Sequence, residues 1–354
     1  MKNTVDFKII TPNEKLTLGL VPYLTFPLTK SCNFNCIYCG IGGETTASLV
    51  HSHCYDTIIE RTKIAIKHNI RKFRFTGGEP FTYPKLFDLI SFFNDLDVFL
   101  LVNTNASLII DKSQIAEISG PNVHYAASLD SLDEDNFNRI SGTTQYFERV
   151  IQGIKFLSKK NRLLRLNMVV SKYNYKELFS IIEFCQDLGC HLKLLDVVSV
   201  PLPYSTRDKM HVSLDEVEKK LAEKAEKIEL HEYARGFGTP CKIYSIKGVN
   251  VTVKSTSHGS RYDEDGICSQ CPYFPCHEGL YDLFHLPDDR LCGCRWSKSS
   301  VSTSQQFEEA LEEMIKIFQR ATWVKQTLTK GMVPAPKFVM DTGLYNNDWE
   351  KNKR

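Results

Sequence analysis

The sequence predicts an α/β fold, a partial (β/α)6 barrel of the TIM type followed by a small cysteine-rich domain. Between residues 22 and 230, short β-branched or aromatic runs alternate with longer amphipathic stretches, which is typical of parallel βα units. From about residue 236 the composition shifts to glycine, proline, cysteine and short strands. We therefore expect a barrel domain over residues 1–230 and a second domain over residues 231–354.

The apolar periodicity places each element of the barrel. Strands are expected at residues 22–28, 71–76, 97–103, 122–128, 163–170 and 191–198. Helices are expected at residues 54–68, 84–95, 112–118, 133–140, 145–159 and 174–188. Gly189 follows the last helix, at a position that tolerates positive φ. In such a sheet the carboxyl ends of the strands carry the site.

The remaining chain predicts a surface helix and a few short strands. A charged amphipathic helix is expected at residues 214–229, with Leu214, Val217, Leu221 and Ala225 on one stripe. Strands are expected at 241–246, 249–254, 281–286 and 290–294, and a final helix at 304–322.

Composition excludes several classes of protein. The 354 residues carry 44 basic and 42 acidic side chains, so the net charge is +2, which argues against a strongly basic nucleic-acid binder. No apolar run approaches the roughly 20 residues that span a membrane. The charged N-terminus lacks the apolar segment of a secretory signal. We expect a cytoplasmic protein that binds neither a membrane nor a nucleic acid polymer.

Twelve cysteines are unusual for such a protein, because a reducing compartment gives structural disulfides little support. Most of them cluster, which favours metal binding. Cys32, Cys36 and Cys39 form a C-x3-C-x2-C loop directly after the first strand. Three thiolates can hold three irons of a 4Fe–4S cluster and leave the fourth iron open. A zinc site completed by His51 or His53 is the alternative.

A second cysteine cluster lies in the predicted C-terminal domain. Its members are Cys268, Cys271, Cys276, Cys292 and Cys294. Four or five thiols within this segment can fully ligate a second 4Fe–4S cluster. A structural zinc ribbon with four cysteine ligands is the alternative. The spacing leaves open which of these thiols bind the metal.

The C-x3-C-x2-C loop, with aromatic Tyr38 before its last cysteine, resembles the signature of the radical S-adenosylmethionine (SAM) superfamily. The resemblance extends over about residues 20–200. It implies that the open iron binds SAM, and that an electron from the cluster cleaves SAM to a 5′-deoxyadenosyl radical that abstracts hydrogen from a substrate. It also implies a flavodoxin-type or ferredoxin-type electron donor.

Further strand-end residues extend this resemblance to the SAM-binding motifs of the family. The implied SAM contacts are Tyr38, Gly77, Gly78, Glu79, Thr104, Ser128 and Val198. Glycines let backbone approach a ligand closely, and the Glu79 carboxylate suits the SAM ammonium group. Val198 replaces a methionine that contacts adenine in the family.

The second domain resembles the auxiliary-cluster (twitch) domain of the GTP 3′,8-cyclase subgroup, and less the longer SPASM domain. Cys294 aligns with the third auxiliary ligand, and Cys276 is an extra thiol that can complete the cluster. Arg74 and Arg165 match positions that contact the nucleotide in that subgroup, and Lys193 replaces an arginine there. These three residues are the candidate substrate-binding residues. The alternative is that they form ion pairs with acidic side chains of the barrel.

The departures from that subgroup lead us to expect a different reaction. Thr25 replaces one arginine, residues 272–274 lack the arginine-x-arginine pair, and the chain ends without a double glycine. We expect a radical SAM enzyme acting on a small anionic, nucleotide-like substrate. One alternative is a peptide-modifying maturase. The 20 residues before the first strand are too few for a leader-binding domain, which argues against this alternative. The other is a non-catalytic zinc or iron–sulfur module.

Overall fold

A computed structural model of the chain describes residues 6–10, 23–39, 52–197, 208–231, 241–263, 268, 280, 282–294, 301–302 and 306–324. The six predicted barrel strands are β2 (Tyr23–Thr29), β3 (Lys72–Gly77), β4 (Phe99–Thr104), β5 (Val123–Ser128), β6 (Leu163–Val169) and β7 (His191–Leu195). They lie side by side in this order, and each neighbouring pair is parallel. The sheet is not closed, so the predicted partial barrel is confirmed.

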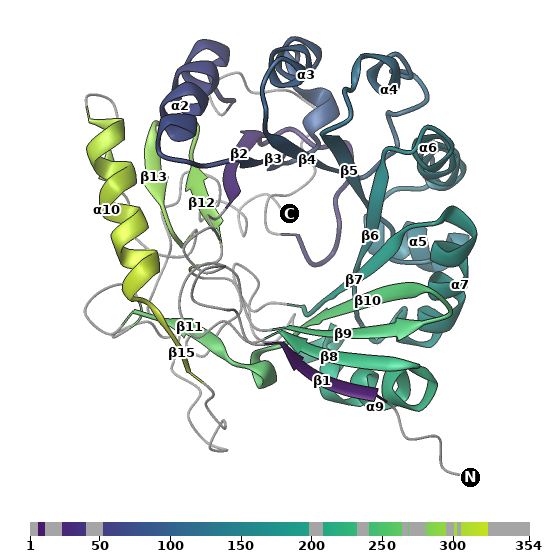
Figure 1. Cartoon of the computed structure of the whole chain (residues 1–354). Coiled ribbons are helices and arrows are strands. Elements are labelled where there is room, and N and C mark those ends of the chain that lie inside the picture. Colours follow the sequence, from purple (N-terminus) through teal and green to yellow (C-terminus); the bar gives the residue numbers. More distant parts are fainter. Residues whose placement is uncertain are drawn as a thin grey trace.

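Amphipathic helices follow the strands and cover the outer face of the curved sheet (Figure 1). They are α2 (Tyr55–Lys67), α3 (Leu86–Asn94), α4 (Ile115–Ile118), α5 (Glu134–Ser141), α6 (Phe147–Lys159) and α7 (Leu178–Leu188). Two of the short 3₁₀ turns are η2 (Pro80–Thr82) and η3 (Tyr175–Glu177). Gly189 ends α7 with a left-handed φ of 64°, as the sequence predicts.

Strands from beyond residue 230 extend the barrel sheet at both edges. β10 (Val249–Lys254) pairs in parallel with β7, and β12 (Asp282–His285) pairs in parallel with β2. β9 (Cys241–Ile246) is antiparallel to β10, and β13 (Arg290–Cys292) to β12. The first and last parts of the chain thus share one sheet, whose far edge is β14 (Val301–Ser302).

The predicted helix at residues 214–229 is too long. α9 (Leu214–Lys224) ends where Ala225 takes an extended backbone with ψ of 136°, and β8 (Lys227–His231) follows. A helical pattern and a strand pattern overlap here. Ile228 and Leu230, two positions apart, are both buried in a strand that pairs with β9. The structure also adds β1 (Asp6–Ile10), an unpredicted strand parallel to β8.

The remaining described elements pack beside the barrel. α10 (Phe307–Arg320) contacts α2 and β13, and β11 (Ser260–Tyr262) pairs with β15 (Thr322–Val324) in a small separate sheet. The turn η4 (Thr256–His258) precedes β11. Within the described part of the chain, no helix is long and apolar enough to cross a membrane.

Candidate functional site

A cavity of about 260 Å³ lies at the carboxyl ends of the barrel strands. It gathers residues from five strand ends and from the cysteine loop that follows β2. Its lining includes Cys32, Cys36, Tyr38, Cys39, Gly77, Gly78, Glu79, Thr104 and Ser128. The three cysteines of the first cluster and every described member of the predicted SAM-binding set therefore meet in one place. Val198 lies outside the described residues.

Backbone contacts with α5 hold the cysteine loop in place. The amide of Asn35 donates a hydrogen bond to the carbonyl of Ser141 at 2.9 Å. The amide of Ile37 donates one to the carbonyl of Ile140 at 2.9 Å. Gly142, with φ of 67°, permits this approach, because a Cβ there would lie 2.3 Å from the Asn35 carbonyl oxygen. A loop fixed by these contacts presents its side chains in a constant direction.

Gly77 and Gly78 bring the end of β3 against the same loop. A Cβ on Gly77 would lie 2.4 Å from the Thr29 carbonyl oxygen, and one on Gly78 would lie 2.1 Å from that of Ser31. The amide of Gly78 donates to the Thr29 carbonyl at 2.7 Å. The close approach that these glycines allow in the structure is therefore to the cluster loop. Their contact with a ligand stays a prediction.

Glu79 ties the ends of β3 and β4 together. Its carboxylate accepts hydrogen bonds from Thr104 Oγ1 at 2.7 Å, from the Asn105 amide at 2.6 Å and from the Phe81 amide at 3.0 Å. Burial raises the pKa of Glu79 to about 7, against the opposing effect of these donors. The carboxylate has a structural role in the described contacts, in addition to the ligand role predicted for it.

Tyr38 and Asp130 form the opposite wall of the cavity. The Tyr38 hydroxyl donates to Asp130 Oδ2 at 2.5 Å, and the Val169 amide donates to Asp130 Oδ1 at 2.8 Å. Burial raises the pKa of Asp130 to about 6. The segment Ser128-Leu129-Asp130 resembles a SAM-proximal motif of the family, although only Ser128 was named as a predicted SAM contact. The structure places Asp130 in the lining of the cavity as well.

The three loop thiols suit an iron–sulfur cluster by their chemistry. Burial, followed by the Glu79 charge, raises the pKa of Cys32 to about 12, and burial also raises that of Cys36. Iron binds thiolates, so these cysteines need a positively charged group to be held ionised. Within the described residues, no three His, Cys, Asp or Glu side chains already stand in a metal-ligating arrangement. The fit rests on three sulfur donors that line one cavity.

A layer of charged side chains lies two residues further down the strands. Arg74, Arg165 and Lys193 each precede by two positions a residue that lines the cavity, so they point to the same inner face. Asp282 from β12 and Lys254 from β10 join them, because both influence the pKa of Lys193. The structure therefore places the three predicted substrate-binding residues together beneath the cavity.

These basic residues differ in their partners. Arg74 forms an ion pair with Asp282 and lies over the Tyr23 ring at 4.2 Å from its centroid. Thr25 Oγ1 also donates to Asp282 at 3.2 Å. Arg165 donates from Nε to Asn167 Oδ1 at 3.0 Å. Within the described residues, neither the other Arg165 nitrogens nor Lys193 Nζ has a hydrogen-bond acceptor. Asp282 lies more than 200 residues from Arg74, so no local pattern could have predicted this pair.

Comparison with known proteins agrees with these observations. The family model of the radical SAM superfamily matches residues 26–185. A probable GTP 3′,8-cyclase of Saccharolobus solfataricus is 31% identical over 217 residues, which are 60% of this chain and 67% of the relative. The chain belongs to the radical SAM superfamily. A probable GTP 3′,8-cyclase of Sulfurisphaera tokodaii is 33% identical over 211 residues, 58% of this chain and 66% of that protein. This radical SAM chain thus spans about two thirds of the length of these curated relatives.

Solved structures show the same fold. Streptococcus suis SuiB bound to S-adenosylmethionine has a TM-score of 0.59 at 13% identity, covering 89% of this chain and 67% of SuiB. SuiB bound to the precursor peptide SuiA has a TM-score of 0.57 at 14% identity, covering 83% of this chain and 66% of SuiB. At such identities the likeness is one of fold, and it carries no substrate to this chain. Membership of the radical SAM superfamily implies a 4Fe–4S cluster and SAM.

The second cysteine cluster of this radical SAM protein is described in part. Cys268, Cys292 and Cys294 are buried, and Cys292 lies on β13 opposite Phe284 of β12. Cys271 and Cys276 lie outside the described residues, as does His51. The metal-binding role of this cluster stays a prediction. Cys185 and Cys190 are buried thiols, as expected for structural cysteines.

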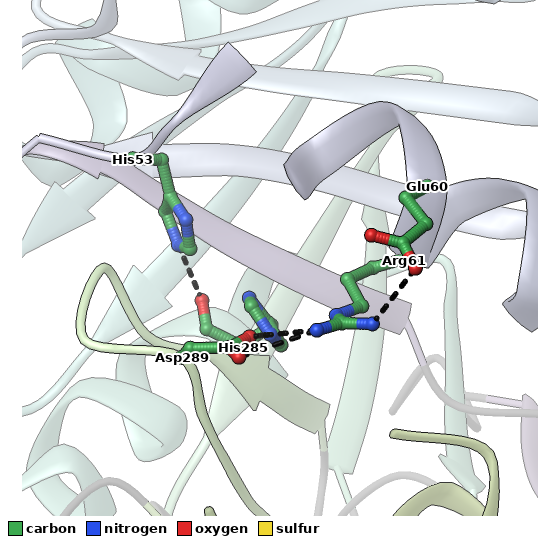
Figure 2. Close-up of polar contacts among 5 residues, drawn as sticks. All are labelled: His53, Glu60, Arg61, His285 and Asp289. Atoms are coloured by element: carbon green, nitrogen blue, oxygen red, sulfur yellow. Dashed lines mark hydrogen bonds and ion pairs between the residues drawn. The ribbon is translucent and has the colours of Figure 1, made fainter. Parts of the chain in front are cut away.

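His53, which the sequence offered as a zinc ligand, takes part in an interface with the C-terminal segment (Figure 2). Its Nε2 donates to the His285 carbonyl at 2.7 Å, and the two rings stack with centroids 5.2 Å apart. His285 Nε2 bonds Asp289 at 2.8 Å, and Arg61 forms an ion pair with Asp289 at 3.2 Å. The network joins α2 to the β12–β13 hairpin.

Proposed function

We propose that this chain is a radical SAM enzyme that reductively cleaves SAM and abstracts hydrogen from a small anionic substrate. One observation carries the substrate class. Arg165 and Lys193 lie directly beneath the strand-end cavity, and within the described residues no acceptor faces the Arg165 terminal nitrogens or Lys193 Nζ. Both side chains are partly buried, and the nearby Asp282 carboxylate offsets their charges only in part. Partly buried cations with too little opposite charge favour a ligand that supplies it. A carboxylate or phosphate group would supply it.

Charge counting supports an anion at this layer. The charges of Arg74, Arg165 and Lys254 all act on Lys193, and among the described residues Asp282 is the carboxylate that acts on it. Asp282 already accepts from Arg74 and Thr25. The anion would therefore be held by Arg165 and Lys193, in line with the cavity above them.

The residues above this layer would bind the cofactors. Cys32, Cys36 and Cys39 would hold a 4Fe–4S cluster, which supplies the electron for SAM cleavage when both are bound. Glu79, through Thr104 and Asn105, would fix the strand ends that flank SAM, and Tyr38 with Asp130 would form the facing wall. The fixed loop would keep the open iron directed into the cavity.

The second cysteine cluster would hold an auxiliary iron–sulfur cluster. Cys268, Cys292 and Cys294 are buried in the described structure, as ligands of a shielded cluster would be. Cys271 and Cys276 are the further candidate ligands. An auxiliary cluster closed by four thiolates would act as an electron relay or as a structural support. A flavodoxin-type or ferredoxin-type protein would supply the electron.

Anaerobic reconstitution tests the proposal. The protein should bind roughly eight irons, as two such clusters require, and should form 5′-deoxyadenosine from SAM under dithionite. Cys36→Ala should abolish that product, whereas Cys54→Ala, which changes an exposed cysteine outside the cavity, should leave it unchanged. A protein that binds only zinc would contradict the enzyme function and favour the non-catalytic module.

The substrate class has its own test. With small carboxylates and phosphates as effectors of 5′-deoxyadenosine formation, Arg165→Gln should weaken the apparent affinity by roughly tenfold to a hundredfold, because it removes a charge-assisted contact. Arg71→Gln, which changes an exposed arginine at the far end of β3, is the control. Equal affinities in the Arg165→Gln variant and the unchanged protein would contradict an anion at this layer.

A further inference from the structure

Lys193 occupies an unusual position for a lysine. It lies on β7, in register with Asn167 of β6 and Thr252 of β10. Leu195, two residues further along the strand, lines the cavity. Lys193 therefore points to the inner face of the barrel, about 7 Å before Leu195 along β7 and in register with Asn167, which also lines the cavity. It has no hydrogen bond or ion pair among the described residues.

The groups around Lys193 are mostly cationic. Arg165 comes from β6, Arg74 from β3 and Lys254 from β10, and the carboxylate that faces it is Asp282 of β12. The Cys241 thiol of β9 is also close, since Lys193 influences its pKa. Asp282 is already bound to Arg74 and Thr25, so it offsets the cationic surroundings of Lys193 only in part.

These surroundings favour the neutral amine. Burial is the largest cause that holds the pKa of Lys193 well below its usual value, followed by the charges of Arg165, Lys254 and Arg74. A neutral amine is a nucleophile, whereas an ammonium group is not, and lysines beside other cations are known to attack carbonyl groups for this reason. The position of Lys193 beneath the cavity gives such an amine access to a bound substrate.

We propose that Lys193 is a catalytic residue that forms an imine with the carbonyl carbon of a 2-oxo acid, whose carboxylate is held by Arg165. This step rests on the proposed function, because it places the substrate under the SAM-binding cavity. The two side chains suit one small molecule. They project from adjacent parallel strands on one face, two residues apart in register, or about 7 Å along the strand. A 2-oxo acid carries its carboxylate directly beside its carbonyl carbon.

The bond changes balance without an oxidant or a reductant. The Lys193 nitrogen lone pair forms a bond to the carbonyl carbon, while the C=O π pair moves to oxygen, which takes a proton. The nitrogen loses its two protons in the course of the reaction, the oxygen leaves as water, and a C=N bond forms. The carbon next to the imine then lies nearest the cavity, where hydrogen abstraction would occur.

Reductive trapping tests the proposal in the full-length, anaerobically reconstituted protein. With sodium pyruvate and sodium cyanoborohydride, peptide mapping by mass spectrometry should find the reduced adduct on Lys193. Lys193→Arg should remove it, Arg165→Gln should lower its yield at least tenfold, and Lys72→Arg, an exposed lysine on β3, should leave it unchanged. Pyruvamide, which lacks the carboxylate, should label poorly.

A second measurement does not depend on the probe or on the variants. The pH dependence of acetic anhydride labelling at Lys193 in the unchanged protein should show a midpoint well below that of Lys72. A midpoint equal to that of Lys72, or absence of the pyruvate adduct from Lys193, would overturn the imine. If 5′-deoxyadenosine still forms in that case, the proposed function stands. If the adduct forms without 5′-deoxyadenosine, the proposed function fails and the imine stands.

Discussion

Gly78 shows at the scale of one residue how the sequence builds the candidate site. A methyl group there would lie 2.1 Å from the Ser31 carbonyl oxygen, so only glycine lets β3 and the cysteine loop meet. The contact is between two backbones, and neither can rotate away as a side chain can. A glycine motif usually interpreted as room for a ligand thus also fixes the loop that carries the cluster ligands.

The Gly78→Ala variant should lose cluster binding before it loses its fold. The displaced loop should cost about 1 to 3 kcal/mol of stability, as overpacking of a dense interior does. Iron content and 5′-deoxyadenosine formation should fall several-fold while the far-UV spectrum is kept. Gly120→Ala is the matched control, because its Cβ would meet the side chain of Asn94 rather than a backbone. A Gly78→Ala protein with full iron content would contradict this explanation.

His53 gives a prediction of pH dependence. Burial, with the neighbouring His285, lowers the pKa of His53 to about 3, whereas an unfolded histidine titrates near 6.5. Below about pH 6.5 the unfolded chain therefore takes up a proton that the folded chain does not. Stability should fall as the pH decreases from about 6.5 to about 3, by no more than about 1.4 kcal/mol for each pH step of one.

The His53→Gln variant should flatten this fall, since glutamine can still donate to the His285 carbonyl and does not titrate. Urea unfolding of the cofactor-free protein at several pH values measures the effect. His191→Gln, an exposed histidine on β7, serves as the control and should keep the unchanged protein's pH dependence. Identical profiles for His53→Gln and the unchanged protein would show that His53 does not carry this effect.

At the scale of elements, the sequence predicted the barrel well and its edges poorly. The six strands and the helices between them occur within a few residues of the predicted ranges, because a strand buried on both faces and an amphipathic helix each leave a local pattern. Residues 225–229 were misassigned because a charged helical pattern continues into a strand whose partner, β9, makes it extended. Tertiary pairing decides such segments, and periodicity cannot reveal it.

In the candidate site, too, the local motifs were predicted and the long-range contacts were not. The cysteine loop, Gly77, Gly78 and Glu79 form contiguous motifs, so the sequence identified them. Two further contacts, that of Asp282 with Arg74 and that of His53 with His285, join residues more than 200 positions apart. No single-sequence pattern links them. The sequence left open that Arg74 pairs with an acidic residue of the barrel, but it could not identify Asp282 as that residue.

The strand β12 stabilises the barrel through Asp282. Replacing Asp282 by asparagine should remove the anionic partner of the largely buried Arg74 charge. The free energy of unfolding should fall by about 3 to 5 kcal/mol. The double variant Arg74→Gln with Asp282→Asn should recover much of this loss, because two amides can bond each other and the Arg74 charge is removed together with its partner. Thermal unfolding of the unchanged protein, the two single variants and the double variant measures the coupling. Additive effects of the two changes would contradict a direct interaction.

At the scale of the whole molecule, the barrel depends on chain that is far away in sequence. β10 and β12 occupy the two edges of the six-stranded unit, and both come from beyond residue 230. Exposed edges of a parallel sheet are prone to aggregate. The two predicted domains are thus joined by strand pairing in the described structure, although the boundary between them remains a prediction.

A chain that ends at residue 230 should therefore fail to fold on its own. It would expose the edges of β2 and β7 and would leave Arg74 without Asp282. Analytical centrifugation and circular dichroism of the shortened chain should show aggregated or largely unfolded protein. Co-expression with a separate segment covering residues 231–354 should restore a soluble complex. A stable, monomeric 1–230 fragment would show that the barrel is autonomous.

The pairing of β12 with β2 also sets the order of events during biosynthesis. β2 leaves the ribosome long before β12, so its edge stays open until residues 282–285 have been translated. The finished wall beneath the cysteine loop is thus a late product of synthesis. We expect iron–sulfur assembly factors to meet a chain in which β12 has already been synthesised, rather than the shorter nascent segment that already carries Cys32, Cys36 and Cys39.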